Sequence, residues 1–442
     1  MKLNVRRTVL MGFAFFSICA FWQMYNNVIP LMLTNTFHMN ETLSGVIMAA
    51  DNVLALFLLP LFGGLSDKCN HPWGRRMPFV IFGTAAAVLL MLALPVIDNA
   101  YARAASATLL TAFVVVLMAV LVAMGTYRSP AVALMPDLTP KPLRSQGNAI
   151  INLMGAVGGI LYLAIAAVLY STSRTEGLDH VNYLPLFAIV AGIMVVSVAI
   201  VFLTIREPEV AAEVAAYEAE HPEENLVEDD GSGNEVLPAA VKKSLAFLLV
   251  SIALWFIGYN AMETWFTTYA AAEWGMSLGS ASTCLIVANL GAIASYIPVG
   301  AVAARFGRKR TILAGVLMLG GGFAFFAIWT FMGGGFSPIL YAVMVILGMG
   351  WACINVNSLP MVVEMCKGSD VGRFTGLYYT FSMAAQTITP IAAGWLMNNI
   401  SYRSLFIYAS LFVLAAFGTM QLVRHGDTTN ITKRGLEALD VD

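Results

Sequence analysis

The chain has 442 residues, of which 59% are hydrophobic and only 11% are charged. An ordinary soluble domain has roughly 25% charged residues, so this chain has too little charge to cover the surface of a soluble enzyme. Its net charge of −2 gives no indication of a nucleic-acid partner. The five cysteines show neither metal-ligand spacing nor a disulfide framework. We therefore expect no metal, no cofactor and no enzymatic activity.

Apolar stretches of about 20 residues, enough to cross a hydrocarbon core of ~30 Å, recur along nearly the whole chain. They predict an all-α membrane protein with twelve transmembrane helices. The predicted helices lie near residues 9–33, 41–65, 77–97, 105–136, 148–171, 183–204, 244–271, 280–303, 311–333, 337–364, 374–398 and 402–423. The first stretch lacks the pattern of a cleaved signal peptide, so we expect it to be retained.

Basic residues favour one side of this predicted topology. If both termini lie in the cytoplasm, 20 of the 24 Lys and Arg residues fall in cytoplasmic segments. Arg103, Arg174 and Arg403 fall outside these segments, and Arg128 falls within a predicted helix. Because positive residues resist translocation, this bias predicts that both termini are cytoplasmic.

Acidic residues gather between the sixth and seventh predicted helices. Eleven of the 26 acidic residues lie between Glu207 and Glu235, a stretch without Lys or Arg. This composition predicts a solvated, largely disordered linker. We therefore expect a six-helix bundle at 1–205, an acidic cytoplasmic linker at 206–242, a second six-helix bundle at 243–424 and a cytoplasmic tail at 425–442.

The two halves repeat a pattern of charges at their predicted cytoplasmic ends. The loops within 63–76 and 300–310 each place a glycine near a helix end and, further on, a glycine followed by basic residues. The fourth and tenth predicted helices each end in an acid that is followed by an Arg at the start of the next helix. Because Arg–carboxylate pairs can hold helix ends together, we predict a cytoplasmic gate formed by Asp67, Arg75, Arg76, Asp137, Arg144, Glu364 and Arg373. Alternatively, the basic residues only mark the topology, above all those of 305–310, a segment without a carboxylate.

This repetition of two six-helix halves is typical of the major facilitator architecture, whose substrate site lies between the halves near the midplane. Within it, residues 63–80 (GGLSDKCNHPWGRRMPFV) resemble the lengthened loop of the plant sucrose–proton symporters and their animal and bacterial relatives, in the glycoside–pentoside–hexuronide group. Five residues, Cys69 to Trp73, separate the basic residue from the next glycine, where most major facilitators have one. Within this group the sequence resembles the bacterial members most. The similarity to them lies in Tyr25-Asn26, Asp51-Asn52 and residues 258–264. The resemblance implies uptake of sugars or glycosides coupled to protons.

The resemblance has a departure in the fourth predicted helix. Leu121 and Val132 stand where the sucrose symporters carry an intramembrane Asp and an Arg, so another acid would have to carry the proton. Ionisable groups at membrane depth are costly and need an explanation. Asp51 and Glu263 are therefore the candidate proton-coupling residues, and Arg128 can pair with Asp51 or bind a sugar hydroxyl. The alternatives are a permanent Asp51–Arg128 ion pair and an external gate at Glu263.

Amides and aromatic rings inside the predicted helices suit a neutral, hydroxyl-rich substrate, because amides donate and accept hydrogen bonds at once and rings pack against a sugar face. Each of these residues could equally hold two helices together. With Arg128, the predicted substrate-binding residues are Tyr25, Asn26, Asn52, Tyr127, Tyr259, Asn260, Trp351, Asn355 and Gln386.

The sequence therefore predicts a secondary active transporter of the plasma membrane, a bacterial inner membrane by the resemblance. It would carry a di- or oligosaccharide or a glycoside by proton symport and work as a monomer in the bilayer. A sodium-coupled sugar symporter and a proton-driven exporter of a small apolar compound are alternatives. A membrane enzyme or a non-transporting receptor is a further alternative from another class, but no catalytic motif or nucleotide-binding loop of the Gly-x-x-x-x-Gly-Lys type appears.

Overall fold

The computed structural model describes residues 3–140, 143–220, 238–365 and 371–427, and these contain helices and no strand. The helices of the first half are α1 Val5–Leu31, α2 Glu41–Asp67, α3 Met77–Arg103, α4 Ala107–Asp137, α5 Arg144–Leu169, α6 Thr172–Thr175, α7 Leu184–Thr204 and α8 Glu207–Glu220. Those of the second half are α9 Ala239–Trp274, α10 Leu278–Phe306, α11 Arg308–Phe331, α12 Ile339–Val363, α13 Val371–Asn399 and α14 Ser404–Gln421. A π-helix, η1 (Met32–Thr36), extends α1.

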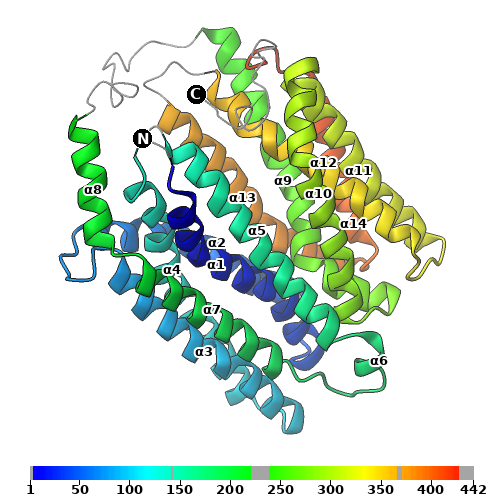
Figure 1. Cartoon of the computed structure of the whole chain (residues 1–442). Coiled ribbons are helices and arrows are strands. Elements are labelled where there is room, and N and C mark those ends of the chain that lie inside the picture. The colour runs from blue at the N-terminus through cyan, green and yellow to red at the C-terminus, as the bar shows by residue number, and fades with distance from the viewer. Residues whose placement is uncertain (1–2, 141–142, 221–237, 366–370, 428–442) are drawn as a thin grey trace. The chain divides into compact units, whose positions relative to one another are not determined.

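The all-α membrane fold is confirmed, and each of the twelve expected apolar stretches corresponds to one long helix (Figure 1). By length and composition, eleven of the described helices can cross a membrane, and α13 is not among them. The sequence of α13 contains four Thr, three Gly, Ser382 and Gln386, and these residues lower its hydropathy.

By internal contacts the chain divides into two compact units, Met1–Met39 with Ala50–Leu226, and Asn40–Ala49 with Val227–Asp442. Each unit is described by itself. The expected boundaries of the bundles and of the tail stay predictions.

In the first unit, α1 packs against α5 and α7, while α3 packs against α4 and α7. Figure 1 shows α3, α4 and α7 side by side. The α1–α5 contact is close because glycines face it: a Cβ on Gly12 would lie 2.7 Å from Cγ of Met154, and one on Gly155 would lie 2.8 Å from Sγ of Cys19. Small residues at such positions let membrane helices approach each other.

In the second unit, α9 packs against α13 and α14, and α12 packs against α10 and α11. The contacts of α12 form a glycine seam, which we define as Gly291, Gly315, Gly348 and Gly350. A Cβ on Gly291 would lie 2.9 Å from the carbonyl oxygen of Val345, and one on Gly315 would lie 2.6 Å from that of Gly350. A Cβ on Gly348 would overlap the carbonyl of Ala288. At this seam backbone therefore touches backbone.

The segment after α7 differs from the expectation. The first residues of the predicted disordered linker form helix α8, Glu207–Glu220. Its start has a local cause, because Pro208 occupies a position where the missing N–H is not needed. The rest of the acidic stretch, residues 221–237, lies outside the described residues.

Candidate functional site

One group of candidate residues lies where the loop after α2 enters α3. We call Asp67, Arg75, Arg76, Asp137 and Glu207 the Arg76 cluster. Nε of Arg76 donates to Oδ2 of Asp137 at 2.8 Å, and Arg76 also pairs with Asp67. Its Nη1 donates to the Ser66 hydroxyl and to the carbonyl of Gly63 at 3.2 Å. Arg76 is 5% exposed, whereas the Asp67 side chain is 54% exposed, so only the Arg76–Asp137 pair is largely shielded from water. Together the two pairs hold the ends of α2, α3 and α4.

The fifth member of the cluster, Glu207, comes from the start of α8. Its carboxylate accepts hydrogen bonds from the backbone N–H of Arg75 at 2.9 Å, of Arg76 at 2.9 and 3.2 Å, and of Met77 at 2.9 Å. These N–H groups belong to the start of α3, and groups at a helix start have no partner within the helix. A carboxylate there also interacts favourably with the helix dipole. Glu207 is 3% exposed, so it acts as a buried cap.

A glycine makes room for this cap. Gly74 has φ of +109°, a backbone conformation that residues with a Cβ rarely adopt. A Cβ at Gly74 would lie 2.7 Å from Cβ of Glu207. Next to it, Trp73 packs its ring against Phe202 of α7, with centroids 5.3 Å apart. The lengthened loop that the sequence singled out is therefore packed onto α7 and capped by α8.

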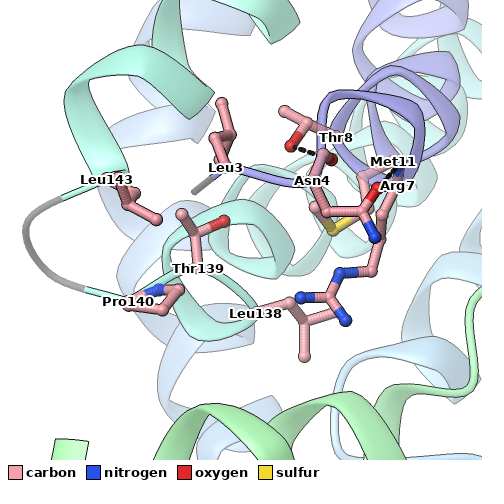
Figure 2. A pocket seen from close by; sticks show the side chains of 9 residues that line it. All are labelled: Leu3, Asn4, Arg7, Thr8, Met11, Leu138, Thr139, Pro140 and Leu143. Carbon is pink, nitrogen blue, oxygen red and sulfur yellow. Dashed lines mark hydrogen bonds between the residues drawn. The ribbon is translucent and has the colours of Figure 1, made fainter. Parts of the chain in front are cut away.

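Helix α8 has a second attachment in the first unit. Nη1 of Arg7 donates to Oε2 of Glu213 at 2.7 Å. Asn4 starts α1 by accepting a hydrogen bond from the backbone N–H of Arg7 on its side chain. Figure 2 shows this first turn of α1 facing the turn between α4 and α5 across a small cavity lined by Thr139 and Leu143.

The second unit repeats the arrangement. Arg308 pairs with Glu364 at the end of α12, as Arg76 pairs with Asp137 at the end of α4. The backbone N–H of Arg308 donates to Oδ1 of Asp427 at 2.7 Å, at the start of α11. Gly307, just before α11, has φ of +93°, and a Cβ there would lie 2.9 Å from Oδ1 of Asp427. Residues 305–310 contain no carboxylate themselves. The acids that bind Arg308 come instead from the end of α12 and from the residues after α14.

Two further gate candidates, Arg144 and Arg373, have side chains that lie outside the described residues. Of the repeated pattern of an acid at a helix end followed by an Arg, the structure therefore describes only the acids, Asp137 and Glu364. Both of these acids pair with the basic residues that precede α3 and start α11.

A second group of candidates lies inside the first unit. Asp51, Arg128 and Trp22 line one cavity of about 10 Å³, roughly the volume that a single water needs. Cζ of Arg128 lies 5.4 Å from the centre of the Trp22 ring, a cation–π geometry. Oδ1 of Asp51 accepts from the side-chain amide of Asn52 at 2.8 Å, and Tyr25 lies within electrostatic reach of Asp51.

Other predicted ligands of the first unit have different surroundings. The Tyr127 hydroxyl is fully buried, within 2.6 Å of the Ser17 hydroxyl, and donates to the carbonyl of Ala14 at 2.9 Å. In this structure Tyr127 therefore joins α4 to α1. Asn26 is half-buried on α1. The roles of both residues stay predictions.

The predicted ligands of the second unit form an aromatic group around α9 and α12. The rings of Tyr259 and Trp351 stack with centroids 3.6 Å apart and planes 7° from parallel. Phe256 packs edge-on against Trp351 at 5.3 Å and against Tyr378 at 6.3 Å. Glu263, one turn after Tyr259, lies within electrostatic reach of it, and no described Lys or Arg forms an ion pair with Glu263.

The predicted amides of the second unit are dispersed. Asn260 is buried and donates its side-chain N–H to the carbonyl of Phe256 at 2.7 Å within α9. Asn355 of α12 is exposed and contacts Tyr296 of α10. Gln386 of α13 is half-buried.

Sequence reasoning missed three contributors. Glu207 and Asp427 were placed in the linker and the tail, and Trp22 was not considered as a neighbour of Arg128. For Glu207 the signal was Pro208, a helix-start residue directly after it. For Asp427 and Trp22 the sequence pattern offers no comparable signal.

Membrane-long helices in two compact units, each with an acid–arginine cluster at one end, define a polytopic membrane protein. The sequence matches the family model of the Major Facilitator Superfamily over residues 11–288 and 267–437. The chain belongs to the Major Facilitator Superfamily.

Solved transporters share its fold. A single-residue mutant of the nucleoside transporter NupG superposes with a TM-score of 0.67 at 13% identity, covering 95% of this chain and 100% of NupG. A bacterial homologue of the iron transporter ferroportin, in an inward-facing state, gives 0.69 at 14% identity, covering 95% of this chain and 99% of the homologue. At these identities the similarity shows the fold alone.

Curated relatives match a shorter part of the sequence. The multidrug resistance protein MdtH of Yersinia pestis (strain Pestoides F) is 29% identical over 121 residues, which are 26% of this chain and 28% of MdtH. MdtH of Yersinia pseudotuberculosis (serotype O:1b) matches to the same extent. The chain thus spans about 28% of the length of the curated relatives it matches.

Proposed function

We propose that the protein is a proton-coupled transporter of a small, neutral, hydroxyl-rich molecule such as a glycoside or oligosaccharide, working by alternating access. The observation that carries this proposal is the position of Asp51 and Arg128 on one small cavity beside Trp22. A carboxylate within reach of a guanidinium can exchange a proton as its neighbours change. It is a suitable coupling group in a chain with few intramembrane charges.

In the proposed cycle, Arg128 pairs with the ionised Asp51 when no proton is bound. Protonation of the carboxylate releases the guanidinium, whose planar fork then binds vicinal hydroxyls of the substrate. Release of the proton on the other side restores the pair and expels the substrate. Glu263, which has no described cation beside it, is the second candidate proton carrier.

The substrate class rests on the side chains available in each unit. Tyr259 and Trp351 present stacked aromatic surface, and rings of this kind pack against sugar faces. The sequence of residues 63–80, which resembles the lengthened loop of the sucrose–proton symporters, supports the same class. We further propose that both termini are cytoplasmic, that the chain sits in a bacterial inner membrane, and that it works as a monomer.

A second candidate function is proton-driven export of a small apolar compound. It is favoured by the similarity to the multidrug resistance protein MdtH over 121 residues. The aromatic group around Phe256, Tyr259 and Trp351 suits an apolar substrate as well as a sugar ring.

Transport into proteoliposomes separates these candidates. Radiolabelled sucrose, maltose, trehalose and a β-glucoside are offered under an inward proton gradient, a sodium gradient or none. Accumulation of one sugar that disappears when the proton gradient is collapsed supports symport. Accumulation under the sodium gradient alone would show that the coupling ion is sodium and not the proton. Failure of every sugar, together with proton-driven efflux of a lipophilic cation dye, overturns the proposal in favour of export.

The role of Asp51 is tested with Asp51→Asn, which keeps the shape of the side chain and removes its charge. We expect the variant to exchange substrate at equal concentrations across the membrane but to lose accumulation against a gradient. Exchange without accumulation is the signature of a lost coupling group rather than of a lost binding site. Accumulation equal to that of the wild type would show that Asp51 does not carry the proton.

A further inference from the structure

A buried carboxylate lies at the end of α3 remote from the Arg76 cluster. Asp98 is 0% exposed, no described group meets full hydrogen-bond geometry with either of its oxygens, and the Thr36 hydroxyl is a side-chain donor beside it. It stands 21 residues after Met77, about 30 Å along the helix at ~1.5 Å per residue. Nε2 of His180, in the segment between α6 and α7, lies 3.4 Å from Oδ2 of Asp98.

Hydrogen bonds around this pair determine where the imidazole carries its proton. The backbone N–H of Leu184 donates to Oδ1 of Asn182 at 3.0 Å, which identifies that atom as the oxygen. The amide nitrogen of Asn99 donates to the same oxygen at 2.8 Å, so the oxygen of Asn99 faces His180. Nε2 of His180 lies 2.9 Å from that oxygen and must therefore donate a hydrogen to it.

This assignment leaves Asp98 with a defined requirement. If the imidazole is neutral, its single N–H already serves Asn99. An ionised Asp98 would then be a buried charge that has, among the described residues, no cation beside it and only the Thr36 hydroxyl as a side-chain donor. Such a charge is strongly unfavourable, so the group takes up a proton instead. A proton on Asp98 neutralises the buried carboxylate, whereas a second proton on His180 would balance its charge with a positive one. Both states have the same net charge.

We propose that Asp98 and His180 together form a proton-binding site that holds one dissociable proton. If both termini are cytoplasmic, as proposed, the site lies at the extracytoplasmic end of the first unit, buried between its segments. It is distinct from Asp51, since Asp98 belongs to another helix and lies near that helix's outer end. The site goes beyond the proposed function, because it needs no substrate.

The proton resides mainly on Asp98. Burial lowers the pKa of His180 below its usual value, which favours the neutral imidazole. Tyr183, just before α7, has its pKa raised by burial, so its phenol stays neutral. Thr36 of η1 lies beside Asp98.

The remaining titratable groups near this end of the unit do not offer a second buried charge. His38, Arg103 and Asp179 are exposed, and the Tyr101 ring packs against Phe37 at a tilt, with centroids 4.6 Å apart. The first turn of α4, residues 107–110, contains no titratable side chain. The bound proton therefore lies where α3, η1 and the segment before α7 meet. Its loss would place a buried negative charge between them, with the Thr36 hydroxyl as its side-chain donor.

Proton counting tests the site without any transport assay. Purified protein in weakly buffered detergent is titrated with a pH-indicator dye, and the wild type is compared with Asp98→Asn and His180→Gln. The matched control is Asp179→Asn, an exposed carboxylate one residue before His180. We expect Asp98→Asn to bind about one proton fewer than the wild type near neutral pH, and Asp179→Asn to match the wild type there.

Infrared pH-difference spectra assign the proton. The wild type should show the carbonyl stretch of a buried carboxylic acid, which Asp98→Asn lacks and which His180→Gln displaces to another pH range. A proton count and a carboxylic acid band unchanged in Asp98→Asn would overturn the site. A monodisperse profile on size exclusion ensures that each variant is folded. Because neither measurement uses a substrate, failure of the proposed transport function leaves this result unaffected.

Discussion

The cap that Glu207 places on α3 gives the sharpest test of the Arg76 cluster. Replacing Glu207 by Ala removes an acceptor for the backbone N–H groups of Arg75, Arg76 and Met77. Loss of a helix cap destabilises by ~0.5–2 kcal/mol, and loss of hydrogen bonds to a charged group by ~1.5–3 kcal/mol. These contributions overlap, so we expect ~2–4 kcal/mol for Glu207→Ala. Glu207→Gln keeps one carbonyl acceptor but not the charge, and should cost ~1–2 kcal/mol.

Hydrogen exchange of purified protein in detergent measures this effect locally. A loss of ~2 kcal/mol, the lower end of this range, raises the open fraction about 30-fold, so the amides of Arg75 to Met77 should exchange faster by at least about that factor in Glu207→Ala. The control is Glu209→Gln, because the Glu209 side chain is 67% exposed and pairs only with exposed Arg206 among the described residues. Its stability should change by less than about 0.5 kcal/mol. Unchanged exchange at Arg75 to Met77 in Glu207→Ala would refute the cap.

Two further variants probe the same design. Gly74→Ala forces a Cβ into the left-handed backbone region and against Glu207, so the melting temperature should fall. In the double variant with Glu207→Ala, Gly74→Ala should lower the melting temperature by less than it does alone, because the contact between the new Cβ and Glu207 is then gone. Fully additive effects would show that this contact is not strained. In the second unit, Asp427→Ala should speed exchange of the amides of Arg308 and Lys309, while Asp67→Ala should not; equal exchange in the wild type and Asp427→Ala would contradict the repeated cap.

The helices could be predicted from sequence because hydropathy alone determines which stretches enter a bilayer. Their ends were less accurate where a helix continues into water. Helix α9 starts at Ala239 instead of 244, since Lys242 and Lys243 are good helix formers that hydropathy does not count. Likewise, α8 was read as a linker because acidic composition hides the start signal at Pro208.

The candidate site could be predicted only in part. The sequence grouped Asp67, Arg76 and Asp137 because both the loop motif and the helix end carry charges in a repeated pattern. Arg76 pairs with both acids, and their role as a gate stays a prediction. The cap by Glu207 is made across 132 residues of sequence, and no local pattern reports such a contact. Tyr127 illustrates a second limit of sequence-based prediction. A tyrosine inside a membrane helix has the same sequence pattern whether its hydroxyl faces a substrate cavity or, as here, the Ser17 hydroxyl.

The glycine seam of the second unit affects how loss-of-function screens of this protein should be interpreted. Gly291, Gly315 and Gly348 meet neighbouring backbone so closely that even a methyl group has no room. A random-mutagenesis screen scored by growth would therefore rank them beside true substrate contacts, although none of them has a side chain with which to recognise anything. Screens that count folded protein as well as activity would separate the two classes, and library designs could leave these codons fixed.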